Sequence, residues 1–443
     1  MCFEFHERCS ARALGRTSFL DELRRVAAGA ILAVLVLAGC SRKEIVPPGP
    51  MEPPAPQFPS PKLETGLPTI YIMAEGSVNS KETYVPATLM VRGAGGYEDL
   101  PVTAPCSIRG RGNTTWTWPK KPYQIKLEDR ISLLGMPAHK RWVLLANFMD
   151  RTLMRNLVSM HVASMTSLAW TPRCVPVELV LNGKHQGSYL LIEQVRIDEN
   201  RVNISDEGYL LELDFHYDNT FQWVDSHGSC WQRWDGIPFS VKEPDTLTPI
   251  RREAIQQYVA GVASALYGSS FRDSVNGYAR YLDVDSFIDY WIVYEVMCNH
   301  ELGNPGSVFF HKDKGGKLTA GPVWDFDWGV LSFYTSGGDK GLVNGKAIWY
   351  ARLMEDPNFR TRLRARFEEL LPRLRTVPDY MDTCEKLLER SAKLNFAMWN
   401  PADDRSQNGG NIINGDENLS FHEAVARLKS NYNTHLEVIL RSL

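Results

Sequence analysis

The sequence lacks several features that define common protein classes. Its eight cysteines include no C-x-x-C pair, which argues against a zinc site or a dithiol redox site. It has 49 basic and 52 acidic side chains and a formal net charge of -3, so it lacks the positive field that favours nucleic acid. It also shows no internal repeat at a fixed period. These absences leave a globular protein that we do not expect to bind nucleic acid.

A long transmembrane run is also missing, but a shorter apolar stretch lies near the N-terminus. Residues 26–40 read VAAGAILAVLVLAGC and follow Arg24 and Arg25. This stretch is shorter than the roughly 20 residues of a spanning helix, and it has the pattern of a secretory signal. Its last four residues, LAGC, look like a bacterial lipobox, in which the Cys40 thiol is acylated. We therefore predict a signal peptide over residues 1–40 and a lipid anchor in the bacterial cell envelope; an uncleaved anchor is the alternative.

The cysteines beyond the signal region are few and scattered. They are Cys106, Cys174, Cys230, Cys298 and Cys384. Five cysteines cannot all pair, so we expect buried apolar side chains or a single bridge.

Residues 41–66 are rich in proline and predict an extended tether, followed by a folded domain over residues 67–443. The front of this domain shows strand-like alternation, the back shows helical periodicity, and a hairpin with an Asn182-Gly183 turn lies between them. The predicted class is α+β, in the order of a bilobal atypical protein-kinase-like fold with a β-rich N-terminal lobe and a helical C-terminal lobe. Strands are predicted at residues 68–73, 87–92, 107–111, 123–127, 141–146, 177–183, 187–195, 208–214, 307–312 and 318–324, and helices at residues 151–165, 249–267, 284–298, 358–371, 380–394 and 420–443.

A glycine-rich cluster with basic residues is the first candidate site. Residues 108–116 read IRGRGNTTW, and residues 119–126 read PKKPYQIK. Glycines allow the backbone to approach an anion, and arginine and lysine supply compensating charge. The alternative is a glycine-rich turn with solvated arginines. There is no Walker motif, so this is not an ordinary P-loop. The candidate phosphate-binding residues are Arg109, Gly110, Arg111, Gly112, Lys121 and Lys126.

The second candidate site follows a helix that is apolar on nearly every side. The predicted helix over residues 284–298 delivers Glu301 to a loop, and a hairpin then ends at Asp325 and Asp327. This order matches the catalytic segment of protein kinases, in which a loop carboxylate accepts the hydroxyl proton and a later Asp holds magnesium. The alternative is a buried carboxylate pair neutralised by basic residues of the front lobe.

Four motifs in order give the sequence a resemblance to a known family. They are IRGRGNTTW with PKKPYQIKL, WVLLANFMDRTLMRN, VELVLNGKHQGSYLLIEQV and GPVWDFDWG. Together they resemble the CotH (spore coat protein H) kinase family over roughly residues 67–327, and more loosely in the helical tail. The resemblance implies binding of ATP with Mg²⁺ or Mn²⁺, and transfer of the γ-phosphoryl group to a hydroxyl of a protein. For an exported chain, that substrate is expected in the cell envelope.

The resemblance also implies roles for individual residues. Lys126 resembles the lysine that contacts ATP phosphates, and Asp325 resembles the metal-holding aspartate. Glu301 stands where the family commonly has Asp, so it keeps the carboxylate with one more methylene. Asp327 is expected to supply a further metal ligand.

Two further positions complete the expected site. The Asn that kinases carry five residues after the base is replaced by Gly306, so Asn304 or Ser307 is expected to take its place as a metal ligand. Glu193, at a strand end, lies where a kinase hinge would face adenine; an ordinary exposed glutamate is the alternative.

Two rival functions remain open. In the first, a non-catalytic surface lipoprotein uses its aromatic stretch, residues 221–234, to bind polysaccharide or a protein partner. In the second, a glycoside hydrolase uses Glu212 and Asp214 as its carboxylates. These two lie at i and i+2 on one strand, closer together than an acid and base flanking one bond usually are.

Overall fold

The structure, a computed structural model, describes residues 63–216, 219, 221–228, 230, 236–332, 341–401 and 414–443. The chain divides into two units, residues 1–56 and 57–443, and the described residues all belong to the second. Within these ranges no helix has the length and apolar character needed to cross a membrane. The predicted signal peptide, Cys40 and most of the tether lie outside them.

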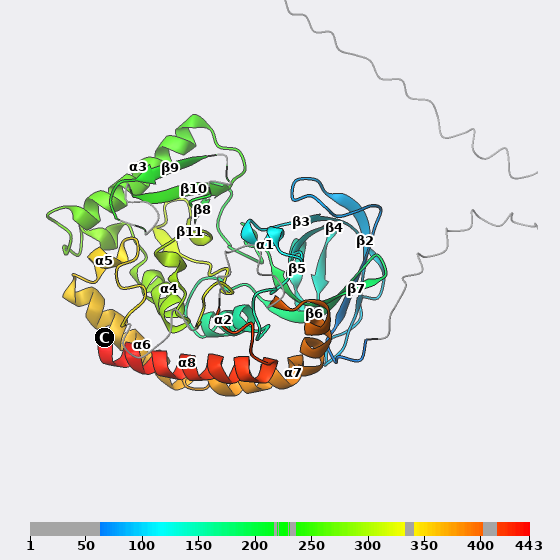
Figure 1. Ribbon diagram of the computed structural model, residues 1–443. Helices are drawn as coiled ribbons and strands as arrows, with labels where there is room; N and C mark the ends of the chain where they lie inside the picture. The colour runs from blue at the N-terminus through cyan, green and yellow to red at the C-terminus, as the bar shows by residue number, and fades with distance from the viewer. Residues whose placement is uncertain are drawn as a thin grey trace, which may run out of the picture. The chain divides into compact units, whose positions relative to one another are not determined.

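Seven strands of the front region close into a barrel, in the order β1, β2, β3, β4, β5, β7, β6 (Figure 1). Strands β1 and β6 are parallel, and the other neighbours are antiparallel. The strands are β1 (Thr69–Ala74), β2 (Val85–Arg92), β3 (Ala104–Gly110), β4 (Tyr123–Leu133), β5 (Met136–Leu145), β6 (Cys174–Leu181) and β7 (Lys184–Glu193).

The alternation of apolar residues along these strands explains the barrel. Side chains of a strand point to opposite faces in turn, so every second residue fills the interior. On β4, for example, Ile125 and Leu127 lie in the barrel core, whereas Lys126 between them is exposed. This geometry directs Lys126 away from the barrel interior.

A second sheet lies in the back region, in the strand order β12, β11, β8, β10, β9. Helix α4 contacts β12 and also α2, α6 and α8, and it is buried along nearly its whole length, as its sequence predicted. The elements are α1 (Thr114–Thr117), α2 (Arg155–Ala163), β8 (Tyr209–Leu213), β9 (Gln222–Asp225), β10 (Ile237–Glu243), α3 (Pro249–Tyr267), η1 (Tyr278–Arg280), α4 (Val284–Val296), η2 (His300–Leu302), β11 (Val308–Lys312), β12 (Leu318–Ala320), α5 (Tyr350–Leu353), α6 (Pro357–Leu374), α7 (Val377–Met398) and α8 (Phe421–Ser442).

The structure confirms a mixed α+β class, with a β-rich N-terminal region and a helical C-terminal region. Three local predictions were wrong. Helix α2 begins at Arg155 rather than at residue 151, because Leu153 adopts a left-handed φ of 56°. Strand β12 ends at Ala320 rather than at residue 324, just before Pro322, which has no amide to donate to a ladder. Strand β10 was not predicted.

The five cysteines in the described ranges are all free, and four of them are buried. The apolar interpretation of these side chains is therefore confirmed, and the alternative of one bridge is wrong.

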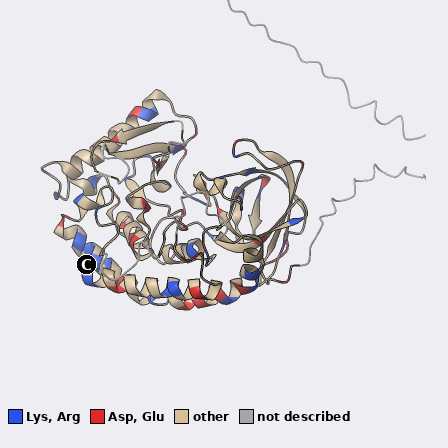
Figure 2. Ribbon diagram, viewed as in Figure 1, with Lys and Arg blue, Asp and Glu red and all other residues tan. Residues whose placement is uncertain are grey.

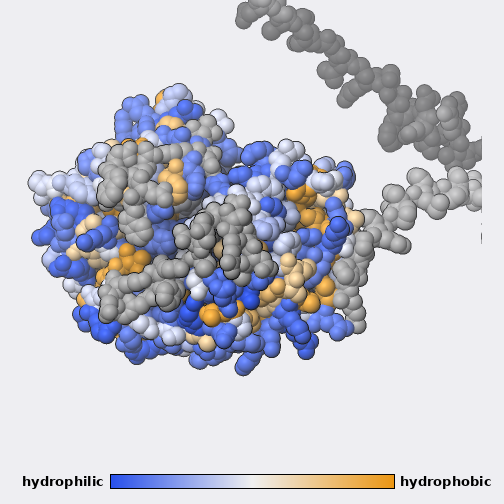
Figure 3. All heavy atoms as spheres, viewed as in Figure 1, coloured by the Kyte–Doolittle hydropathy of each residue, from blue (hydrophilic) through white to orange (hydrophobic). Residues whose placement is uncertain are grey.

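Helices α7 and α8 lie side by side and connect the two regions (Figure 1). Helix α7 contacts β7 of the barrel at one end, and both helices contact the helical region. Acidic and basic residues are spread along these helices (Figure 2). The described atoms on the visible face are mostly hydrophilic, with smaller hydrophobic patches (Figure 3).

A buried lysine fastens α7 to the barrel. The Lys120 side chain is fully buried, and its Nζ donates to Ala146 O at 2.7 Å, to Ser188 O and to Asn395 Oδ1 of α7 at 2.8 Å. Burial lowers the pKa of this ammonium to about 7. Lys120 belongs to the basic run of residues 119–126, whose lysines were expected to offset the charge of an anion, but its contacts make it a structural link.

We predict that Lys120→Met lowers the free energy of unfolding by about 2 kcal/mol, because three buried acceptors lose their donor. The neighbouring Lys121→Met is the matched control. Lys121 is partly exposed and donates to Trp116 O, so its loss should cost about 0.5 kcal/mol. Urea unfolding of both variants measures the difference; equal losses would contradict the assigned role.

Candidate active site

The loop after α4 places Glu301 in a defined position. Cys298 ends the helix with a left-handed φ of 51°, a conformation that non-glycine residues adopt at a cost and that recurs at functional sites. The next residue, Asn299, is fully buried, and its Oδ1 accepts a hydrogen bond from the Glu301 amide at 2.9 Å. The short helix η2 then carries Glu301.

The segment of residues 325–327 is held by three asparagine side chains. Asn299 Nδ2 donates to Asp325 O at 3.1 Å, Asn156 Oδ1 accepts from the Phe326 amide at 2.8 Å, and Asn414 Nδ2 donates to Asp327 O at 3.1 Å. These asparagines come from the end of α4, from α2 and from the chain before α8. They fix the backbone of both aspartates.

Asp325 itself has a left-handed φ of 63°. Between the two aspartates, Phe326 is fully buried and packs on Tyr294 of α4, with ring centroids 4.8 Å apart. The segment is therefore anchored by its central side chain as well as by its backbone.

Glu301, Asp325 and Asp327 form one group, here named the carboxylate cluster. Burial raises the pKa of Glu301 well above its ordinary value, and the charges of Asp325, Asp327 and Asp214 add to the rise. Burial raises the pKa of Asp327 well above its ordinary value, and the charge of Asp325 raises it further. The pKa of Asp325 is also raised, mainly by burial. Asp325 and Asp327 also share a side-chain hydrogen bond, which lowers the pKa of Asp325 and raises that of Asp327.

Arg111 brings positive charge from the barrel side to this cluster. Its charge lowers the pKa of Asp325 and of Asp327, and its guanidinium carbon lies 5.6 Å from the ring centroid of Trp324. Among the described residues, Arg111 has no nitrogen within 4 Å of a carboxylate oxygen of the cluster. Burial lowers the pKa of Arg111, whereas the charges of Asp325 and Asp327 raise it, and its side chain is partly exposed.

The glycines beside Arg111 are required by the loop. A Cβ on Gly110 would lie 2.3 Å from the Trp116 ring, and Gly112 has a φ of +83°. The loop leads into α1, which lies between the barrel and the second sheet in Figure 1. Arg111 of this segment lies close enough to Asp325 and Asp327 for their charges to raise its pKa; phosphate binding by the segment stays a prediction.

Two other predicted nucleotide-binding residues are engaged elsewhere, and a third is exposed. Arg109 donates to Gln124 Oε1 at 3.2 Å and lies over the Tyr84 ring. Lys121 donates to Trp116 O at 2.8 Å. In the described part of the chain, Lys126 is exposed and forms no ion pair with the cluster, so its contact with ATP phosphates stays a prediction.

The Glu193 carboxylate is buried and surrounded by arginines rather than open to a ligand. Arg201 Nη1 pairs with one of its oxygens, and Arg173 donates to the other from its amide at 2.8 Å and from Nε at 3.1 Å. The alternative of an exposed glutamate is wrong. Both carboxylate oxygens have arginine partners, so these hydrogen bonds do not support a role of Glu193 in binding adenine.

The described residues contain no group of three or more His, Cys, Asp or Glu side chains that could hold a metal ion alone. However, Glu301 Oε2 and Asn304 Oδ1 are both buried without a hydrogen-bond partner. Magnesium is usually held by one or two carboxylates together with substrate phosphates. The donor set therefore fits a divalent ion that arrives with a nucleotide. Ser307, just before β11, has no contact that assigns it to this ion.

The structure adds two carboxylates that the kinase interpretation missed. Glu212 and Asp214 on and after β8 are buried; Glu212 raises the pKa of Asp325, and Asp214 raises that of Glu301. Glu212 Oε2 accepts from Lys242 Nζ at 2.8 Å. Their i, i+2 spacing was visible in the sequence, but nothing there connected them with residues 301–327.

The aromatic stretch is only partly described. Phe221 and Trp223 pack against the main hydrophobic core, and Trp223 stacks on Phe239 at 5.4 Å. Trp231 and Trp234 lie outside the described residues. The two described rings thus contribute to packing.

These features define a chain with a glycine-rich basic loop facing a buried carboxylate cluster. Residues 108–439 match the family described as CotH kinase protein. The chain belongs to the CotH kinase family, which implies a kinase that uses ATP. No curated protein sequence matches it significantly.

We predict that Asp327→Asn stabilises the protein when metal and nucleotide are absent. Because the pKa of Asp327 is raised, the folded state binds this proton more tightly than the unfolded state does. The resulting contribution to stability is fully present below the ordinary pKa, near 3.8, and is lost as the pH rises through the higher pKa of the folded state. The gain in free energy of unfolding should therefore increase from pH 4 to pH 7 and reach on the order of 1 kcal/mol.

Scanning calorimetry across this pH range tests the prediction. Asp129→Asn is the control, because Asp129 is exposed, and it should give no such gain. If Asp327→Asn destabilised the protein at pH 7, a raised pKa of Asp327 in the folded state would be contradicted.

Proposed function

We propose that the chain is an exported, ATP-dependent protein kinase that transfers the γ-phosphoryl group to a hydroxyl of an envelope protein. The observation that carries this proposal is the carboxylate cluster beside the loop of Arg111. Burial raises the pKa of all three carboxyl groups, and the charges of Asp325 and Asp327 raise that of Glu301 further, so a bound cation would favour their ionised forms. A metal-bound nucleotide supplies both that cation and the phosphates that suit the arginine.

Different side chains would bind the metal ion and the phosphates. Asp325 and Asp327 would hold Mg²⁺ or Mn²⁺, with Asn304 Oδ1 as a further oxygen. Such an ion, when bound, neutralises charge on the β- and γ-phosphates. Arg111 is placed to bind a phosphate oxygen, and the absence of side chains at Gly110 and Gly112 lets the backbone approach it.

Glu301 is proposed as the general base. Its unpaired Oε2 accepts the proton of the substrate hydroxyl, while the hydroxyl oxygen bonds to the γ-phosphorus and the bond to the bridging oxygen breaks. The products are ADP and a phosphoprotein. Burial and the charges of Asp325, Asp327 and Asp214 raise the pKa of Glu301, which makes its carboxylate a stronger proton acceptor.

We predict that Asp325→Ala abolishes phosphoryl transfer, because positioning and charge stabilisation supply most of the rate. Glu301→Gln should slow transfer by about 10²–10⁴-fold, the usual contribution of a general base, and should leave nucleotide binding nearly intact. Incubation with γ-labelled ATP and Mg²⁺ or Mn²⁺ measures autophosphorylation and transfer to envelope proteins.

The matched control is Glu301→Asp, which keeps the carboxylate and should remain active. Lys126→Met tests whether Lys126 contacts ATP phosphates from its exposed position: a loss of nucleotide binding would support that contact. Equal labelling of the wild type and Asp325→Ala would refute the kinase proposal.

Export and anchoring rest on the lipobox at residues 37–40 and on the proline-rich segment that follows it. A diacylglycerol on Cys40 would hold the domain at the membrane through the tether. This places the kinase in the bacterial cell envelope, near the proposed substrates.

We predict that Cys40→Ser shifts the protein from the membrane fraction to the soluble fraction or leaves it unprocessed, with no change in the melting temperature of the folded domain. Mass spectrometry of the wild-type N-terminus provides the measurement. A mature N-terminus upstream of residue 40 with an unmodified thiol would show that the anchor assignment is wrong.

A further inference from the structure

Residues 414–417, here named the latch segment, reach from the start of α8 to the backbone of the metal-binding aspartates. Asn414 is buried, and its amide nitrogen donates to Asp327 O at 3.1 Å and to Met149 O at 3.0 Å. Its Oδ1 accepts from the Gly329 amide at 2.9 Å. One side chain therefore holds both sides of the turn that follows Asp327.

The latch segment is itself held by buried charge. Asp416 Oδ2 accepts from Arg155 Nη2 at 2.8 Å and lies 3.5 Å from Arg427 Nη2. Arg427 of α8 also donates to Gly415 O at 2.6 Å and to Asn414 O at 3.1 Å. The aspartate is 1% exposed, so docking of the segment depends on these arginines.

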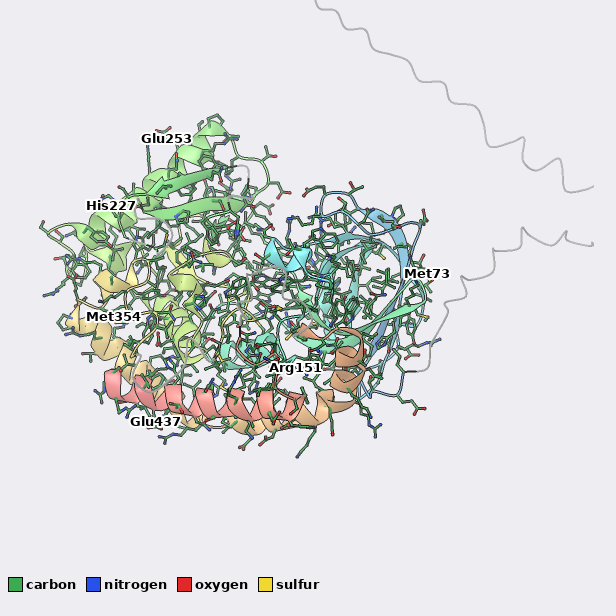
Figure 4. The ribbon with its side chains drawn as sticks, viewed as in Figure 1. Met73, Arg151, His227, Glu253, Met354 and Glu437 are labelled. Atoms are coloured by element: carbon green, nitrogen blue, oxygen red, sulfur yellow. The ribbon has the colours of Figure 1, made fainter. Side chains whose placement is uncertain are left out.

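The same arginine of α2 joins the latch segment to the chain beyond the aspartates. Arg155 pairs with Asp150, and its Nε donates to Val330 O at 2.8 Å. Nearby, Arg151 Nε donates to Leu419 O at 2.7 Å, and Figure 4 labels Arg151 where α2 approaches the start of α8. Arg151 and Arg155, just before and at the start of α2, therefore contact the start of α8 and the chain after Asp327.

We propose that the latch segment controls the carboxylate cluster: the site binds its metal-nucleotide ligand tightly only while residues 414–417 are docked. This inference rests on the proposed function and adds a means of regulation to it. Asp325 has a left-handed backbone, and side chains of other segments hold the backbone from Asp325 to Gly329 by hydrogen bonds, so this turn depends on external restraint. Asn414 supplies that restraint from a part of the chain remote in sequence.

Coupling between two sites is reciprocal, so ligand binding must stabilise the docked latch. In the full chain, Mg²⁺ with a non-hydrolysable ATP analogue should slow hydrogen exchange of the Gly329 amide and of residues 415–419 by about 5-fold or more. Protection confined to residues 108–116 and 298–304 would overturn the inference. Failure of the wild type to bind the analogue at all would overturn the proposed function and this inference with it.

A pair of variants tests the same point without relying on exchange. Asn414→Leu removes three hydrogen bonds around the turn and should weaken Mn²⁺ binding in the presence of the analogue by about 10-fold, as loss of an outer partner of a metal site does. Asn431→Leu is the control. Asn431 Nδ2 donates to Leu331 O at 2.9 Å, a carbonyl that lies beyond the turn held by Asn414. Titration calorimetry should find this variant within about twofold of the wild type.

A merely structural role for Asn414 predicts a different result. Both variants would then lower the melting temperature and leave the Mn²⁺ affinity of the folded protein unchanged. That outcome would refute the latch while leaving the proposed kinase activity in place, provided that Asp325→Ala still loses binding.

Discussion

Repulsion among Glu301, Asp325 and Asp327 is the constraint on which the rest of this structure depends. These carboxyl groups are partly buried, which raises all three pKa values, and the charges of Asp325 and Asp327 raise that of Glu301 further, so the group needs a backbone that is held in place. Buried asparagines provide that hold through hydrogen bonds to residues 325–327. The left-handed conformation of Asp325 is held by the hydrogen bond from Asn299 to its carbonyl oxygen. A bound cation would reverse the sign of the interaction and turn repulsion into affinity.

The need for restraint explains why distant elements meet near these aspartates. The loop after α4 supplies Asn299, α2 supplies Asn156, and the chain before α8 supplies Asn414. Lys120 ties α7 to the barrel that carries the loop of Arg111. The arginine and the carboxylates therefore come from two regions whose relative position is set by buried polar contacts. Such contacts contribute modest net stability, but they are costly to break on one side.

Much of the fold could be predicted because its elements follow local patterns. Alternation along the barrel strands and the apolar circumference of α4 were visible in the sequence, as were Glu301, Asp325 and Arg111 as candidates for one site. The rest depended on tertiary context. No pattern could show that Lys120 is buried or that the carboxylate of Glu193 is held by Arg173 and Arg201. Nor could one show that asparagines far apart in the chain meet at residues 325–327.

The most direct test of the central claim is electron paramagnetic resonance of Mn²⁺ with ATP bound to the full chain. The account predicts an immobilised Mn²⁺ signal with coupling to phosphorus in the wild type. It also predicts loss of that signal in Asp325→Ala, because the ion would have lost a carboxylate that holds it. If the wild-type spectrum equals that of Mn²⁺ and ATP in buffer, the carboxylate cluster is not a metal-nucleotide site.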